Sequence, residues 1–289
     1  MNPAVGNVPA VGIEVRVDRA TVLPGSAWCA ERPRALVAIV HGLGEHSGRY
    51  AALAAELVKA RCTVVALDLP GHGGASGPRG DMTSWAQVRD QVLPAMFTAT
   101  RGLPDQPFED LPRVLLGHSM GGVLALDYAI QHPRDLKALV LSAPGLRSAT
   151  PPWWKLALAN VARATAPSTG FPHGLDVKGI SRDPEVVKAY QSDPLVHGKI
   201  SPRLFFEFDE ARQRCMSEAR QLSVPTLLLQ GMDDRMVDPK GALEFAASAT
   251  HGVVRFVTHK ETYHEIFNDH GREAVIRDLA AWLDAALVV

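Results

Sequence analysis

The chain has 289 residues, of which 46% are hydrophobic, enough for one large domain or a domain with an insertion. Its 30 Lys and Arg residues oppose 31 Asp and Glu residues, so the net charge of -1 gives no case for nucleic acid or an anionic membrane as a partner. The distant cysteines Cys29, Cys62 and Cys215 predict no disulfide framework and no zinc site, which fits a cytoplasmic protein. Residues 1–10 lack a secretion signal pattern, and no apolar run is long enough to span a bilayer.

The predicted elements alternate between strands and helices. Residues 11–17 and 26–30 are expected to form two edge strands joined through Pro24-Gly25. Continuous apolar runs, typical of parallel strands covered on both faces, follow at residues 35–40, 62–67, 114–116, 138–141, 226–229 and 253–257. Segments with one apolar face predict helices at residues 51–60, 85–97 and 275–287. This alternation predicts a doubly wound α/β fold, a mostly parallel sheet flanked by helices, with its chemistry at the carboxyl ends of the strands.

One stretch, from about residue 145 to 201, breaks the alternation and supplies no convincing parallel strand. It is rich in Pro and Gly and carries apolar residues at helical spacing: Trp153, Trp154, Leu156, Leu158 and Val161. This content favours a small helical subdomain over a flexible excursion. We therefore expect a core of residues 1–145 and 201–289, with residues 146–200 inserted as a cap over the strand ends.

The segment Gly117-His118-Ser119-Met120-Gly121 lies between an apolar run and a segment with helical apolar spacing. A sharp strand-to-helix turn strains its middle residue, and flanking glycines relieve the crowding and leave the Ser119 hydroxyl projecting. The N–H groups at the helix start face the place where an oxyanion would form. A glycine-rich connection with an incidental serine is the alternative, but this context favours a nucleophile.

A serine nucleophile needs a base and a carboxylate that orients the base. Residues 226–231 run into a carboxylate-rich turn at residues 232–239, and His264 follows the next predicted strand. The order Ser, Asp, His, each just beyond a strand, is that of the α/β-hydrolases, which favours His264 as the base over a surface histidine. Asp233, Asp234 and Asp238 share the turn, so these residues alone leave the acid open.

A second glycine-rich loop, His41-Gly42-Leu43-Gly44, follows the predicted strand that ends at Val40. Such a loop can turn backbone N–H groups toward the serine, although it can equally make only a tight turn. The candidate oxyanion donors are the N–H groups of Leu43 and Met120.

Five motifs together resemble the monoacylglycerol lipase and lysophospholipase group of the α/β-hydrolases. They are residues 41–50 (HGLGEHSGRY), 68–73 (DLPGHG), 117–122 (GHSMGG), 193–195 (DPL) and 231–234 (GMDD). The likeness runs from about Arg34 to the C-terminus and includes the cap. It implies that the acid stands three residues after Gly231, at Asp234, with the adjacent Asp233 as a departure from the pattern. It also implies that the Leu43 and Met120 amides hold the oxyanion.

The resemblance further implies that Glu45, His46 and Arg49 hold their loop in shape rather than do chemistry. The expected protein is a serine carboxylester hydrolase that cleaves monoacylglycerol-like lipid esters through an acyl-enzyme on Ser119, with no metal or cofactor. Because triad geometry does not identify the acyl group, alternatives are a lysophospholipase, a short-chain esterase or thioesterase, and a non-catalytic ligand-binding protein of this fold. The cap is expected to touch a membrane or micelle surface transiently, and the oligomeric state is left open.

Overall fold

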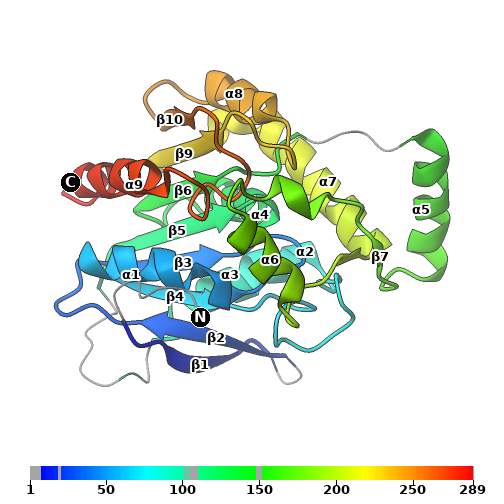
Figure 1. Cartoon of the computed structure of the whole chain (residues 1–289), viewed down its shortest axis with the longest axis horizontal. Coiled ribbons are helices and arrows are strands. Elements are labelled where there is room, and N and C mark those ends of the chain that lie inside the picture. Colours follow the sequence, from blue (N-terminus) through cyan, green and yellow to red (C-terminus); the bar gives the residue numbers. More distant parts are fainter. Residues whose placement is uncertain (1–7, 19–20, 101–102, 104–109, 148–151, 289) are drawn as a thin grey trace.

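The computed structural model describes residues 8–18, 21–100, 103, 110–147 and 152–288. Residues 1–7, most of the segment that lacks a secretion signal pattern, lie outside this range. An eight-stranded sheet crosses the molecule (Figure 1) in the order β1-β2-β4-β3-β5-β6-β9-β10. Its strands are β1 (Val11–Arg16), β2 (Val22–Trp28), β3 (Ala35–Val40), β4 (Cys62–Leu67), β5 (Arg113–His118), β6 (Ala138–Ser142), β9 (Thr226–Gly231) and β10 (Val254–His259). From β4 to β10 all neighbours are parallel, which confirms the predicted sheet.

The N-terminal strands correct one expectation. Pro24-Gly25, predicted to be a turn, lies inside β2, and the chain reverses earlier, where the Val17 N–H donates to the Thr21 carbonyl (3.0 Å). Gly25 has a packing role, because a Cβ at this position would lie 2.3 Å from the carbonyl oxygen of Ala66. Glycine thus lets β2 pair closely with β4. Of the two strands predicted as edges, only β1 is one, since β2 lies between β1 and β4.

Helices cover both faces of the sheet (Figure 1). They are α1 (Ala51–Lys59), α2 (Trp85–Gln87), α3 (Leu93–Met96), α4 (Met120–Gln131), α7 (Pro202–Ser217), α8 (Pro239–Ser248) and α9 (Arg272–Ala286). Alternate residues of a buried strand enter different cores: Leu36 and Ala38 of β3 pack on the side of α3, α4, α7 and α8, whereas Val37 and Ile39 pack on the side of α1 and α9. Two covered faces explain why the strands are apolar throughout.

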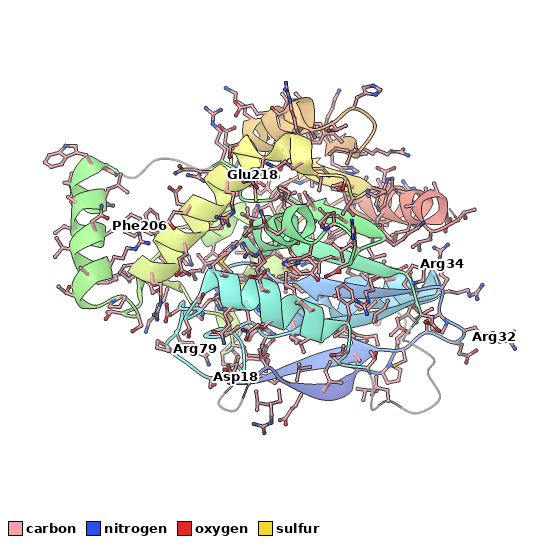
Figure 2. All side chains as sticks on the ribbon, turned by 180° about the vertical axis from the view of Figure 1, so that it is seen from behind. Asp18, Arg32, Arg34, Arg79, Phe206 and Glu218 are labelled. Atoms are coloured by element: carbon pink, nitrogen blue, oxygen red, sulfur yellow. The ribbon has the colours of Figure 1, made fainter. Side chains whose placement is uncertain are left out.

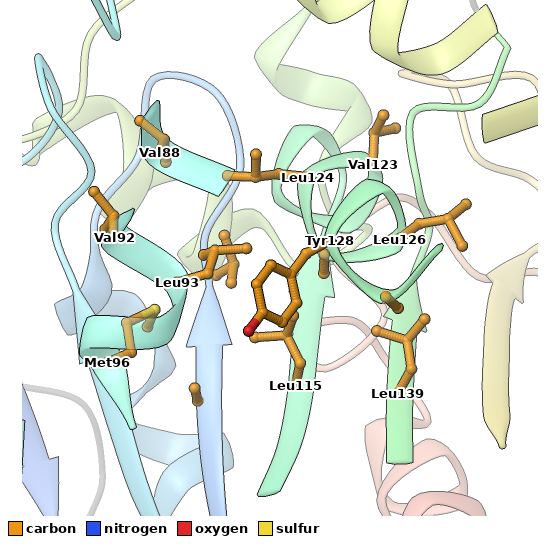
Figure 3. Packing of buried hydrophobic residues seen from close by; sticks show 14 of the residues in the cluster. Val88, Val92, Leu93, Met96, Leu115, Val123, Leu124, Leu126, Tyr128 and Leu139 are labelled. Atoms are coloured by element: carbon orange, nitrogen blue, oxygen red, sulfur yellow. The ribbon is translucent and has the colours of Figure 1, made fainter. Parts of the chain in front are cut away.

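The helix predicted at residues 85–97 is continuous but not uniform. A π-helical turn, Val88–Val92, separates α2 from α3. Pro94 has no N–H to donate and its ring crowds the preceding turn, which accounts for the widened helix before it. The apolar face is nevertheless preserved: Leu93 and Met96 pack near Leu115 of β5 and Tyr128 of α4 (Figure 3).

Residues 146–200 contribute no strand to the large sheet in the part that is described. They contain α5 (Trp153–Thr165), α6 (Pro184–Ser192) and the strands β7 (Phe171–Pro172) and β8 (Lys199–Ile200), which pair only with each other. Helix α5 stands at one end of the molecule beyond α7 (Figure 1), and Phe206 of α7 lies on the side toward it (Figure 2). Arg163 of α5 pairs with Glu210 of α7 (3.0 Å) and lies over the Phe206 ring (5.0 Å).

The apolar side chains of α5 do not form a small core. The exposed fractions of Trp153, Trp154, Leu158 and Val161 are 81%, 48%, 63% and 63%. Three of these residues, Trp154, Leu158 and Val161, follow the helical spacing of one face, so α5 presents an apolar stripe to its surroundings. No helix within the described ranges is long and apolar enough to cross a bilayer.

Candidate active site

Ser119 occupies the sharp turn between β5 and α4, with φ of 54° and ψ of -118°. This conformation is strained for a residue other than glycine and is typical of a nucleophile at such a turn. The flanking glycines permit it: a Cβ at Gly117 would lie 2.3 Å from the Gly121 carbonyl oxygen, and one at Gly121 would lie 2.3 Å from those of Val40 and His41. The helix therefore crosses close to the ends of two strands, and Ser119 stands at the crossing.

The loop after β3 approaches Ser119 closely. A Cβ built on Gly42 would lie 3.3 Å from the Cβ of Ser119, and the Gly42 N–H donates to Glu45 Oε1 (2.6 Å). Leu43 lines the same pocket as Ser119. Met120 is the first residue of α4, so its N–H has no carbonyl partner within its own helix. The two candidate oxyanion donors thus come from the elements that meet at the serine.

His264 and Asp234 meet across the carboxyl ends of β10 and β9. His264 Nδ1 lies 2.8 Å from Asp234 Oδ2. The other carboxylate oxygen, Oδ1, accepts the N–H groups of Met236 (2.8 Å) and Val237 (3.0 Å). These bonds fix the carboxylate against the imidazole, and Nε2 is left as the ring nitrogen available for proton transfer.

The other two aspartates of the turn have different surroundings. Asp233 is exposed. Asp238 is the N-cap of α8, and its side chain accepts the N–H of Lys240 (3.0 Å). Of the three aspartates that the sequence left open, the structure brings Asp234 to His264.

Electrostatics favour an ionised Asp234 beside a basic His264. Burial opposes charge on both side chains, but their mutual attraction and hydrogen bond outweigh it, so the pKa of His264 is raised and the pKa of Asp234 is lowered. The neighbouring His118 ring lies 4.7 Å from the His264 ring. Burial and the proximity of His264 lower the pKa of His118 to about 4, so this side chain is neutral.

Ser119 and His264 line one pocket, which encloses about 350 Å³ including its mouth. Its apolar walls are Leu43, Leu175, Ile180, Tyr190 and Met236. The inserted region, residues 146–200, supplies Leu175, Ile180 and Tyr190 from α6 and the loop before it, whereas no residue of α5 lines the pocket. A pocket with apolar walls and a few polar groups at one place is the usual form of a small-molecule site.

A buried ion-pair network lies beside the pocket. Arg49 Nη1 donates to Glu45 Oε2 (2.8 Å) and to Glu265 Oε1 (2.6 Å), and Nη2 donates to Glu265 Oε2 (2.7 Å). Burial would raise the pKa of Glu45, but the Arg49 guanidinium and nearby histidines lower it to about 2. Glu265 was missed by sequence reasoning. Its only signal was a carboxylate directly after His264, because its partner Arg49 is 216 residues away.

The loop of residues 41–50 also contacts the inserted region. His46 Nε2 lies 2.9 Å from Asp193 Oδ2, which joins two of the motifs noted in the sequence. The Gly44 carbonyl accepts the N–H of His197 (2.8 Å). These contacts agree with a role for His46 in shaping the loop.

A further buried carboxylate, Asp269, joins the inserted region to the loop that carries His264. It accepts the backbone N–H of Arg182 (2.8 Å), Arg182 Nε (3.0 Å) and the backbone N–H of Tyr263 (2.7 Å). The Ser181 hydroxyl also donates to it (3.2 Å). The inserted region therefore helps to position the residue next to His264.

The described residues contain no group of three or more His, Cys, Asp and Glu side chains placed to hold a metal ion. All three cysteines are free, and burial raises the pKa of each thiol.

Comparisons with known proteins point the same way as this geometry. Residues 31–271 match a protein family described as serine aminopeptidase, S33. The chain is 32% identical to a monoacylglycerol lipase of Mycolicibacterium smegmatis, over 87% of this chain and 88% of that protein. It is also 34% identical to phospholipase YtpA of Bacillus subtilis, over 89% of this chain and 98% of that protein.

Solved structures show the same fold. The crystal structure of a monoacylglycerol lipase from Paleococcus ferrophilus superposes with a TM-score of 0.81 at 34% identity, over 91% of this chain and 99% of that one. A soluble variant of the Saccharomyces cerevisiae monoglyceride lipase, solved with a substrate analog, gives a TM-score of 0.83 over 99% of this chain and 100% of that one. At 20% identity this second structure supports the fold alone.

Proposed function

This chain belongs to the serine aminopeptidase S33 family of serine hydrolases and is a carboxylic ester hydrolase, and on that premise we propose that its substrates are monoacylglycerols. The observation that carries the proposal is the apolar-walled pocket that contains both Ser119 and His264. A single acyl chain can lie along the apolar walls while the ester carbonyl reaches the serine. Each buried methylene contributes about 0.8 kcal/mol of transfer free energy.

The proposed reaction proceeds through an acyl-enzyme. Ser119 Oγ attacks the ester carbonyl carbon while His264 Nε2 takes its proton, and the N–H groups of Leu43 and Met120 stabilise the oxyanion. His264 then protonates the departing alcohol. A water molecule, deprotonated by His264, attacks the acyl-enzyme and releases the fatty acid, and the proton returns to Ser119. Asp234 holds the His264 tautomer throughout and stabilises the imidazolium.

We propose that residues 146–200 act as a cap on this site. Leu175, Ile180 and Tyr190 come from this region and line the pocket, which supports the proposal. A covered pocket admits one chain with a small head group more readily than the three chains of a triacylglycerol. The exposed stripe of α5 would then rest on a lipid surface while substrate enters, since an apolar helix face with Lys155 beside it suits the membrane interface.

A phospholipase or lysophospholipase is the second candidate, because a relative with this activity in its name is 34% identical over nearly its whole length. The test is kcat/KM for a monoacylglycerol, a triacylglycerol, a lysophospholipid and a short-chain p-nitrophenyl ester. We expect the monoacylglycerol to be the best substrate. Preference for triacylglycerol or lysophospholipid would refute the proposal that monoacylglycerols are the substrates. No hydrolysis of any of these esters would indicate a ligand-binding protein.

The nucleophile is tested in the same assay. Ser119→Ala should fold normally and lose several orders of magnitude in kcat, because the serine and the base act as a unit. A fluorophosphonate probe should label the wild type and not this variant. Labelling that persists in Ser119→Ala would show that another residue is the nucleophile.

A further inference from the structure

The pocket around Ser119 is lined by two glutamates but by no lysine or arginine among the described residues. Glu45 and Glu265 are among its lining residues, and the described lining contains neither lysine nor arginine. The side chains of both glutamates are almost fully buried, with exposed fractions of 5% and 6%. Any charged group on a bound substrate would therefore meet a negative potential within a site of restricted water access.

The guanidinium of Arg49, which packs beside this site, is already neutralised. Both carboxylates bind it, and Glu265 does so through two parallel bonds of 2.6 and 2.7 Å. One face of the guanidinium is covered by the Tyr190 ring, whose centroid lies 4.6 Å away. Two carboxylates around one guanidinium leave a net charge of one negative unit.

The carboxylates cannot easily turn away to release Arg49. Glu45 Oε1 also accepts the Tyr50 hydroxyl (2.8 Å) and the Gly42 N–H (2.6 Å). Glu265 Oε2 also accepts Asn268 Nδ2 (3.0 Å). Because every carboxylate oxygen of the pair is bonded, the network is rigid and its charge is fixed in place.

Three other basic side chains lie in or near the pocket, and of these Arg235 keeps its charge but is not among the described lining residues. Arg235, next to the lining residue Met236, lies over the Tyr263 ring at 4.4 Å from its centroid. His118 is buried beside His264, and its imidazole is neutral. His264 itself faces Asp234.

We propose that Glu265, by completing the neutralisation of Arg49, makes this site reject esters whose alcohol carries a phosphate or a carboxylate and accept those whose alcohol is uncharged or cationic. The inference rests on the proposed function, and it concerns the selectivity of the site for a glycerol ester over the phosphorylated form of the same ester. An anion in the pocket would lose its hydration, find no lysine or arginine among the described lining residues and lie against like charge, all of which disfavour its binding. The same charge should also hasten departure of the anionic fatty acid product.

The first test uses the wild-type protein and three esters with the same acyl chain in micelles of a neutral detergent. They are a 1-monoacylglycerol, its 3-phosphate and an acylcholine, so size and charge of the alcohol vary separately. We expect kcat/KM for the phosphate to be lower than for the monoacylglycerol by a factor of about 100 or more, and the acylcholine to stay within about tenfold. Equal use of the phosphate, or equal rejection of choline and phosphate, would overturn the proposal. Failure to cleave the monoacylglycerol would instead refute the proposed function.

The second test is Glu265→Gln, which removes one negative charge at nearly constant shape. The ratio of kcat/KM for the phosphate to that for the monoacylglycerol should rise by about tenfold or more, because the variant has one negative charge fewer to repel the anion. Inhibition by added fatty acid should strengthen in parallel. Glu261→Gln, an exposed glutamate in the same loop, is the matched control and should leave both quantities unchanged. An unchanged ratio in folded Glu265→Gln, or the same rise in Glu261→Gln, would show that Glu265 does not set the selectivity.

Discussion

Asp233 and Asp234 are neighbours in sequence and differ completely in environment. Asp234 contacts His264 at 2.8 Å, whereas Asp233 is exposed. Asp234→Asn should reduce kcat by roughly 10³ to 10⁴ by disturbing the His264 tautomer, and Asp233→Asn should have little effect. Steady-state hydrolysis of a p-nitrophenyl ester measures both. If Asp233→Asn reduced kcat more than Asp234→Asn, the assignment of Asp234 as the carboxylate that orients His264 would be wrong.

The pH dependence follows from the raised pKa of His264. The base must be neutral to accept a proton from Ser119, so kcat/KM should fall as the pH drops through this pKa. The midpoint of the acid limb should therefore lie above about 6.5, the ordinary value for histidine. Removing the charge that raises the pKa, with Asp234→Asn, should move the limb to lower pH, measured on the residual activity. If the acid limb of the Asp234→Asn variant stayed at the wild-type pH, the assignment of His264 as the base paired with Asp234 would be contradicted.

Among the helices, α5 has an unusual surface, because its apolar face is exposed where a helix of a globular protein usually buries that face. Its apolar side chains Trp153, Trp154, Leu158 and Val161 are exposed, and burying each such side chain is worth about 1.5–3 kcal/mol. Replacing all four by serine should reduce binding to phosphatidylcholine vesicles by about 100-fold or more, as measured by co-sedimentation.

The matched control is Leu243→Ser, which removes a side chain of α8 that is 54% exposed. It should leave vesicle binding unchanged. Hydrolysis of a soluble ester reports whether the α5 variant is folded. Wild-type-like vesicle binding by the folded α5 variant would refute the lipid contact.

At the scale of the whole molecule, the inserted region and the core are held together by buried polar contacts. Asp269→Ala would remove the acceptor of Tyr263 and Arg182 and should lower the free energy of unfolding by about 3 kcal/mol. It should also lower kcat, because the His264 loop loses an anchor. Asp284→Ala breaks an exposed pair with Arg34 and should cost at most about 1 kcal/mol. Equal denaturant midpoints for the two variants would show that Asp269 is not an anchor.

The contacts of Asp269 also affect how the proposed cap is best tested. Deleting residues 147–200 would remove the Ile180 carbonyl that accepts the Glu265 N–H (2.8 Å), together with the contacts of Arg182. Loss of activity would then not distinguish the cap from the His264 loop. Substitutions of Leu175 and Tyr190, which line the pocket, are the cleaner probes of acyl-chain preference.

The core fold and the candidate residues at the strand ends could be predicted from the sequence. Apolar runs with two buried faces and helices with one apolar face are local patterns, so the ends of the parallel strands were predicted to within two residues. The glycines around Ser119 are likewise a local signal, because a sharp turn needs them where they stand. Local reasoning was wrong at Pro24-Gly25, where close approach of β4, and not a turn, requires the glycine.

Contacts between residues far apart in the chain could not be predicted and are seen in the folded structure. Arg49 and Glu265 are far apart in the chain, and neither residue type predicts the other. The apolar residues of α5 fitted a buried core equally well by their spacing, since periodicity shows that a face exists and not what covers it. The apolar pocket wall instead includes Leu175, Ile180 and Tyr190, and their local sequence does not show that these side chains face Ser119. Contacts between distant segments depend on the packing of the whole chain, and local sequence patterns do not predict them.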